Sequence, residues 1–171
     1  MAGKDKNMSV FIAYGSNLLS APVTASQAFA SVVKALQERG PVVNRISRLW
    51  VSKAWPNPDD PPYVNAVLQI KTDIQPAELM LLLHEMEHES GRVRDGRLNA
   101  PRVLDLDLIA YDDVVLDGEN GLILPHPRAA ERAFVMGPMS DIAPDWLHPI
   151  LRQTAANLFK SATIGVDAYP L

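Results

Sequence analysis

The sequence predicts an α+β domain whose strands and helices follow the order β-α-β-β-α-β, with a hairpin and a helix added after them. Short apolar runs bounded by glycine, proline and polar turn residues indicate the strands. Two longer segments repeat apolar residues every three or four positions, which indicates helices that each bury one face. The 171 residues, 47% hydrophobic and 21% charged, are enough for one domain with a core. We therefore expect a single domain over residues 1–171, in which residues 1–8 form a flexible N-terminal segment.

The first half of the chain predicts a strand, a helix and two further strands. Ser9–Tyr14 is an apolar run followed by glycine, which is typical of a buried strand that ends in a turn. Thr24–Gly40 has its apolar residues on one helical stripe and ends at a Gly-Pro pair. Val42–Trp50 and Tyr63–Thr72 have the apolar alternation of strands, and the four prolines of Ser52–Pro62 predict a loop between them.

The second half predicts a helix, a charged loop and a fourth strand before the added elements. Pro76–Gly91 begins with proline and ends with glycine, as helices often do. Gly91–Ala100 is a loop rich in arginine, and Ala100–Tyr111 contains the apolar run of a buried strand. Asp112–Pro127 predicts a hairpin, and a final helix is expected to begin near Pro149. This order is that of a ferredoxin-like sandwich, in which helices cover one face of a mainly antiparallel sheet.

The composition argues against several classes of protein. Sixteen basic residues against twenty acidic ones give a net charge of −4, which disfavours a surface that coats nucleic acid. The chain has no cysteine, so it has neither a disulfide framework nor a thiolate metal site. It also lacks an apolar run of the ~18 residues that a membrane span needs, and its start lacks the pattern of a secretory signal. We expect a cytoplasmic protein that binds neither nucleic acid nor membrane.

Two aspartates interrupt the apolar residues of the fourth strand. Because side chains alternate along a strand, Asp105 and Asp107 share one face, with Cα atoms roughly 6.5–7 Å apart, while Leu104, Leu106 and Leu108 point into the core. Two carboxylates at that separation disfavour each other's ionised form unless a positive charge lies between them. A magnesium ion would supply that charge and takes oxygen ligands. The alternative is a pair of aspartates on the solvent face of the strand.

Arginines cluster just before the aspartate pair in the sequence. Guanidinium groups bind phosphate through two parallel hydrogen bonds, so this cluster favours a site for a polyphosphate. The alternative is a solvated loop whose ion pairs contribute little stability. No Walker-type phosphate loop is present, so a nucleotide would be held in another way. The arginines are Arg92, Arg94, Arg97 and Arg102.

Five segments carry a resemblance to one enzyme family. They are "FIAYGSNL", "PPYVNAVLQIKT", "HEMEHESGRVR", "RLNAPRVLDLDLI" and "LPHPRAAERAFVMGPMSDIAPDW". In this order they resemble the motifs of the hydroxymethyldihydropterin pyrophosphokinases, and the resemblance extends from Val10 to Leu158. It implies a ferredoxin-like enzyme of folate biosynthesis that transfers pyrophosphate from ATP to 6-hydroxymethyl-7,8-dihydropterin and releases AMP. Two Mg²⁺ ions per active site are implied with it, and we expect the protein to be a monomer.

The resemblance also implies roles for individual residues. Asp105 and Asp107 would be the metal ligands, and Arg92 and Arg102 would stabilise the group in transfer. The ATP contacts would be Glu87, Arg94, Leu108, His126 and Arg132, and the pterin pocket would comprise Ser52, Trp55, Tyr63, Asn65 and Phe134. Stacking between two rings and hydrogen bonding to an amide suit a flat polar heterocycle. The loops Ser52–Pro62 and Gly91–Ala100 are candidate lids over bound ATP.

Two other functions remain open on the sequence. One is a magnesium-dependent nucleotidyltransferase, since Gly15-Ser16 and the Asp-Leu-Asp triplet echo that pattern, although such pairs normally lie closer in sequence. The other is a non-enzymatic ferredoxin-like binding module, such as an RNA-recognition domain. The acidic balance and the aspartate pair disfavour it.

Overall fold

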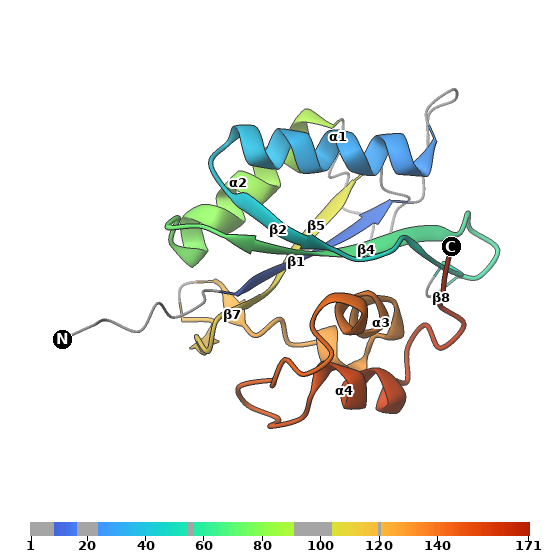
Figure 1. Cartoon of the computed structure of the whole chain (residues 1–171). Helices are drawn as coiled ribbons and strands as arrows, with labels where there is room; N and C mark the ends of the chain where they lie inside the picture. The colour runs from blue at the N-terminus through green and yellow to red at the C-terminus, as the bar shows by residue number, and fades with distance from the viewer. Residues whose placement is uncertain (1–8, 17–23, 55–56, 91–103, 120) are drawn as a thin grey trace.

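The computed structural model describes residues 9–16, 24–54, 57–90, 104–119 and 121–171, which form an antiparallel sheet with helices on both faces (Figure 1). The elements in chain order are β1 (Val10–Ser16), α1 (Ala25–Glu38), β2 (Val42–Ile46), β3 (Trp50–Ser52), β4 (Tyr63–Lys71), α2 (Pro76–Glu89), β5 (Asp105–Tyr111), β6 (Leu116–Asp117), β7 (Ile123–Leu124), the 3₁₀ helix η1 (Ala129–Glu131), α3 (Ala133–Ile142), α4 (Ala155–Ser161) and β8 (Tyr169–Pro170). The predicted α+β class is confirmed.

β1 lies near the middle of the sheet, between β5 and β4. The strand order is β5-β1-β4-β3-β8, β2 also pairs with β4, and these pairings are all antiparallel. β1 pairs with β4 from Val10 opposite Ile70 to Ser16 opposite Val64. One strand therefore separates β5 from β4, so side chains of these three strands can share one surface.

The strand predicted over Val42–Trp50 is interrupted in its middle. β2 and β3 both pair with β4, and Ser47 lies between them. The Ser47 N–H donates to the Val67 carbonyl over 3.0 Å, and its hydroxyl accepts from the Val67 N–H over 2.9 Å. Because a side-chain oxygen takes the place of a backbone carbonyl, regular pairing breaks there.

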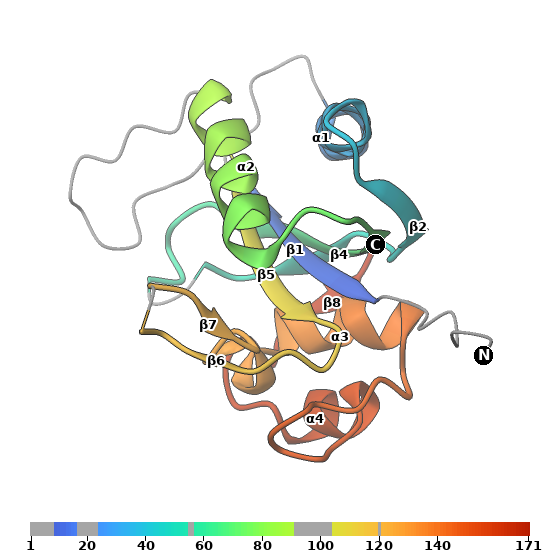
Figure 2. The ribbon, with the colours of Figure 1, turned by 90° about the vertical axis from the view of Figure 1, so that its left-hand side faces the viewer.

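Helices cover both faces of the sheet (Figures 1 and 2). α1 and α2 lie on one face, over a core that includes Ile12, Leu36, Leu68, Leu83 and Leu106. α3 and α4 lie on the other face, over a core that includes Phe11, Val67, Ile109, Met136 and Leu158. The expectation that helices cover only one face is therefore wrong, because the segment after β7 forms a second helical layer.

α3 was not predicted because it contains Gly137 and Pro138, which normally end helices. The glycine has a packing reason, since a Cβ at Gly137 would lie 2.6 Å from Cζ3 of Trp50. The proline is buried within the same helix. Tight packing of α3 against β3 thus overrides the local helix-breaking signals.

The remaining additions are a short hairpin and the last helix. Leu116 pairs with Leu124 in the β6–β7 hairpin, so the predicted hairpin is confirmed. α4 begins at Ala155, later than the predicted start near Pro149, because the Thr154 hydroxyl caps it by accepting from the Asn157 N–H over 3.2 Å. None of the helices in the described ranges is both long and apolar enough to cross a membrane.

Candidate functional site

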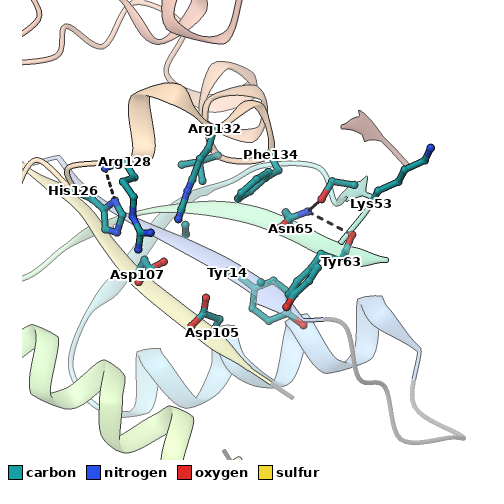
Figure 3. Close-up of a pocket in the computed structure, with 14 residues that line it drawn as sticks. Tyr14, Lys53, Tyr63, Asn65, Asp105, Asp107, His126, Arg128, Arg132 and Phe134 are labelled. Carbon is teal, nitrogen blue, oxygen red and sulfur yellow. Dashed lines mark hydrogen bonds between the residues drawn. The ribbon is translucent and has the colours of Figure 1, made fainter. Parts of the chain in front are cut away.

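β5 presents its two aspartates on the face of the sheet that carries α3. Asp105 and Asp107 are half-buried, whereas Leu106 and Leu108 are at most 2% exposed in the core beneath α2. The predicted alternation is therefore confirmed. Figure 3 shows both carboxylates directed toward the side chains that descend from the α3 side.

Small residues of β1 leave room beside the carboxylates. Ala13 lies opposite Asp107, and Gly15 lies opposite Asp105 on one side and Asn65 on the other. A Cβ at Gly15 would lie 3.8 Å from both Asn65 Oδ1 and Asp105 Cβ. Gly15 was expected to end the strand, but it lies within β1 and forms an open floor between β5 and β4.

A pocket of about 170 Å³ opens above this floor (Figure 3). It brings together residues predicted separately from the sequence, which come from β3, β4, β5 and the segment around η1 and α3. The predicted residues that line it are Ser52, Tyr63, Asn65, Asp105, Asp107, His126, Arg132 and Phe134. Further lining residues are Ala13, Tyr14, Gly15, Lys53, Arg128 and Val135.

His126 is tied to β5 and to its own loop. Its N–H donates to the Ile109 carbonyl over 2.8 Å, and its Nδ1 accepts from the Arg128 N–H over 3.2 Å. Burial lowers the pKa of His126, and the nearby Arg132 and Arg128 lower it further, while Asp107 opposes them. Because Nδ1 accepts a hydrogen bond, the neutral ring carries its proton on Nε2, from which it can donate.

Two arginines bring positive charge to the acidic end of the pocket. Arg128 is exposed and Arg132 is half-buried, and Figure 3 shows both side chains reaching down from the η1 and α3 side toward the sheet. The Arg132 guanidinium carbon also lies 5.7 Å from the centroid of the Phe134 ring. Arg128 was not predicted. Arg128 lies two residues after the predicted site residue His126, and this closeness in sequence could have indicated it as a further basic residue of the site.

The other end of the pocket combines rings with a buried amide. Asn65 is 5% exposed, and its Nδ2 donates to Ser52 Oγ over 3.0 Å. This bond fixes which end of the amide carries the carbonyl. Figure 3 shows Tyr63 on β4 and Phe134 on α3 beside Asn65. The arrangement suits a flat ligand with hydrogen-bonding groups on its edge.

Two predicted residues do not line the pocket. Leu108 is 2% exposed in the core on the opposite face of β5, so its side chain does not reach the aspartate face. Glu87 is also 2% exposed, and its Oε1 accepts from the Leu106 N–H over 2.8 Å. Glu87 thus holds β5 from beneath the sheet. Trp55, Arg92, Arg94 and Arg102 lie outside the described residues.

The acidic end offers a metal only part of a ligand set. No cluster of three or more histidine, cysteine, aspartate or glutamate side chains that could hold a metal occurs in the part of the chain that the structure describes. Asp105 and Asp107 supply carboxylate oxygens from one face. A hard ion bound there would take its remaining ligands from water and from phosphate oxygens, which suits Mg²⁺.

Comparisons with known proteins agree on one family. The family described as 7,8-dihydro-6-hydroxymethylpterin-pyrophosphokinase (HPPK) matches residues 11–144. A 2-amino-4-hydroxy-6-hydroxymethyldihydropteridine pyrophosphokinase of Pseudomonas aeruginosa is 35% identical over 161 residues, which are 94% of this chain and 96% of that protein. The folic acid synthesis protein fol1 of Pneumocystis carinii is 34% identical over 154 residues, covering 90% of this chain but only 20% of its own length.

Solved structures agree in fold. An HPPK-DHPS of Plasmodium falciparum, crystallised with pteroate, has a TM-score of 0.62 at 12% identity and covers 90% of this chain and 42% of that one. The chain spans 20% of the length of the Pneumocystis protein and 42% of the Plasmodium one. It spans nearly all of the Pseudomonas protein. Since the family match covers most of the chain and several relatives share over 30% identity, the chain belongs to the 7,8-dihydro-6-hydroxymethylpterin-pyrophosphokinase family.

Proposed function

We propose that this chain transfers pyrophosphate from ATP to 6-hydroxymethyl-7,8-dihydropterin and releases AMP, as a step in folate synthesis. The observation that carries the proposal is the union of two unlike ends in one pocket. One end holds Asp105, Asp107 and two arginines, and the other holds rings and a fixed amide. A reaction that transfers a phosphate group to a flat heterocycle needs both ends at once.

The proposed metal site consists of Asp105 and Asp107. Mg²⁺ bound between them would neutralise phosphate charge and help to hold ATP against the sheet. The two carboxylates lie on a regular strand, and Glu87 fixes the main chain of that strand from the opposite side. A strand held in this way keeps the carboxylate oxygens of Asp105 and Asp107 in place when the substrate binds.

Positive groups on the α3 side act on the phosphates. Arg128 and Arg132 bind phosphate oxygens through charge-assisted hydrogen bonds, and neutral His126 donates from Nε2. By family resemblance Arg92 and Arg102 add two guanidinium groups during transfer. Charge on the migrating group is thereby stabilised, which is most of what phosphoryl-type transfer requires from a protein.

The heterocycle binds at the other end. Tyr63 and Phe134 stack on its two faces, and Asn65 forms hydrogen bonds with its edge. Ser52 keeps the Asn65 carbonyl available by accepting from Nδ2. A buried amide aimed at a substrate edge strongly rejects analogues that lack the matching groups.

The bond changes follow from this arrangement. The hydroxymethyl oxygen attacks the β-phosphorus of ATP in line, and the bond between that phosphorus and the bridging oxygen to the α-phosphate breaks. AMP leaves with this oxygen. The hydroxyl proton passes to a phosphate oxygen or to water, because a loose transition state does not need a strong base.

The proposal also covers the fold, the cellular location and the oligomeric state of the protein. The order β1-α1-β2-β3-β4-α2-β5, in which β2 and β3 both pair with β4 as one interrupted strand, supports a ferredoxin-like single domain. α1 and α2 lie on one face of its antiparallel sheet, and α3 and α4 add a second layer on the other. We propose that the protein is cytoplasmic, since ATP is the proposed substrate, and that it acts as a monomer. Light scattering at micromolar concentration tests the monomer.

Product analysis tests the proposed reaction. The chain is incubated with ATP, Mg²⁺ and the hydroxymethyl pterin, and the products are separated by chromatography. AMP and a pterin diphosphate in equal amounts are expected, and both should require Mg²⁺. Release of free pyrophosphate with a nucleotidylated product would instead identify a nucleotidyltransferase and overturn the proposal.

A further inference from the structure

The chain after α4 returns to the ring end of the pocket. Residues 162–171 follow the part of the chain that the family model matches, which ends at residue 144. The N–H groups of Thr163 and Ile164 both donate to the Glu131 carbonyl over 3.0 Å, and Ala133 N–H donates to the Ile164 carbonyl over 2.8 Å. This segment is therefore bound across the start of α3, the helix that carries Phe134.

Gly165 lies directly against the ring of Phe134. Its φ of +67° is in the left-handed region that favours glycine. A Cβ at Gly165 would lie 2.3 Å from Cδ1 and 3.0 Å from Cε1 of Phe134. No other residue fits here unless the ring moves. Since Phe134 also lines the pocket, the backbone at Gly165 limits how far the ring can move away from the pocket.

Asp167 contacts the chain beside Ser52 at the same end of the pocket. Its Oδ2 accepts from the Lys53 N–H over 2.6 Å, and Lys53 follows Ser52, the partner of Asn65. Beyond it, β8 extends the sheet, with Tyr169 opposite Val51, and Leu171 N–H donates to the Leu49 carbonyl over 2.8 Å. One segment thus touches both the Phe134 wall and the Ser52–Lys53 wall.

We infer that Gly165 and Asp167 are positioning residues for the ring-binding end of the pocket. Gly165 sets the position of the Phe134 ring, and Asp167 fixes the main chain beside Ser52. Stacking on Phe134 and hydrogen bonding to Asn65, the partner of Ser52, both require these groups to stay in place, and a misplacement of about 1 Å can cost up to about 10²-fold in rate. This inference rests on the proposed function, because it treats the ring end as the pterin site.

The first test compares two glycines with similar backbone conformations. Gly165→Ala adds a methyl group against Phe134, whereas Gly121→Ala adds one at φ +80° with no atom within 4 Å. Backbone strain should lower Tm similarly in both variants. Only Gly165→Ala should raise KM for the pterin, by about 10-fold, with KM for ATP within about 2-fold of the unchanged protein. Equal pterin KM values in the two variants would overturn the inference.

The second test keeps or removes the acceptor on Asp167. Asp167→Asn retains an oxygen that can accept from Lys53 N–H, whereas Asp167→Ala does not. Asp167→Ala should raise the pterin KM several-fold, and Asp167→Asn should restore most of it. Val166→Ala, at a side chain that is 72% exposed, serves as the neighbouring control. If Asp167→Ala leaves the pterin KM unchanged, the role of Asp167 is refuted.

The two proposals fail in different ways. A wild-type chain without AMP production overturns the proposed function, and the positioning role falls with it. A wild-type chain that turns over normally, together with an unaltered pterin KM in Gly165→Ala and Asp167→Ala, overturns the positioning role alone. Titration of pterin fluorescence in the absence of ATP gives a second readout of the ring end that does not depend on turnover.

Discussion

The two ends of the pocket consist of different kinds of side chain. The acidic end depends on charged side chains that are half-buried or exposed: Asp105 and Asp107 on a strand, and Arg128 and Arg132 opposite them. The ring end depends on a buried amide and on the Phe134 ring, which the backbone of a distant segment contacts at Gly165. The acidic end is therefore sensitive to charge, whereas the ring end is sensitive to packing. Substitutions at the two ends should separate into two kinetic classes.

Removing one carboxylate should have the largest effect. Asp107→Asn keeps size and polarity but removes the charge that would hold Mg²⁺, so kcat should fall by about 10³-fold or more. Folding should be intact, because asparagine keeps the size and polarity of this half-buried side chain and the neighbouring leucines of β5 stay in the core. Steady-state kinetics and a thermal melt measure these two effects. Asp117→Asn, on the exposed hairpin, should behave as the unchanged protein. Near-normal kcat in Asp107→Asn would contradict the metal assignment.

Replacing the buried amide should be the next largest change. Asn65→Leu removes the groups proposed to bind the pterin edge and takes away the donor to Ser52, so the pterin KM should rise by about 10–100-fold. The ATP KM should be nearly constant. Gln69→Leu, on the same strand and outside the pocket, provides the control. A parallel rise in both KM values would show that the two ends are not independent.

An arginine that the sequence did not predict should matter at the other end. Arg128→Ala should raise the ATP KM by about 10-fold through loss of a charge-assisted hydrogen bond, with little change in the pterin KM. Arg128→Lys should recover part of the loss, since it keeps the charge but not the forked geometry. An unchanged ATP KM in Arg128→Ala would remove this residue from the phosphate site.

A substitution where α3 packs against β3 should alter stability more than substrate specificity. Gly137→Ala places a methyl group 2.6 Å from the Trp50 ring, which should lower the free energy of unfolding by about 1–3 kcal/mol. Urea denaturation measures it, with Ser140→Ala in the same helix as a control. The two KM values should change together if they change at all. A selective rise in one of them would mean that α3 transmits strain to one end.

The smallest expected effect is a pH dependence of stability away from the pocket. Burial lowers the pKa of His148 from its ordinary value of 6.5, and its Nδ1 accepts from Ile150 and Leu151 N–H groups. The neutral His148 ring contributes its full stabilisation above pH 6.5. This contribution is lost as the pH falls below that value, because the unfolded chain then binds the proton more readily. Tm should fall by about 1–3 °C between pH 7.5 and 5.5, and His148→Asn should make this fall smaller, while the lowered pKa of His126 accounts for the remainder.

The parts of the site that lie on strands could be predicted from the sequence. Period-two alternation placed Asp105 and Asp107 on one face, and alternation over Tyr63–Thr72 predicted the strand that carries Tyr63 and Asn65. Both predictions need only local geometry. The same alternation also assigned the neighbouring leucines to the core.

The parts that depend on long-range packing could not be predicted. α3 contains Gly137-Pro138, so its helical form depends on the fit against Trp50, which no local pattern contains. Gly165 and Asp167 contact the pocket residues Phe134 and Lys53 only because 162–171 folds back over α3 and β3. Leu108 was named as an ATP contact by resemblance, and this contact stays a prediction. Its side chain is in the core, because a family motif gives a position without the direction in which a side chain points.

The most direct measurement follows the β-phosphorus of ATP. The chain is supplied with ATP labelled at that atom, Mg²⁺ and the hydroxymethyl pterin, and the position of the label is determined after one turnover. The account predicts that the label appears in the pterin product while AMP is released unlabelled, and that Asp107→Asn abolishes this transfer. Label found in free pyrophosphate or remaining on the nucleotide would contradict the central claim that the two ends of the pocket join one heterocycle to one migrating diphosphoryl group.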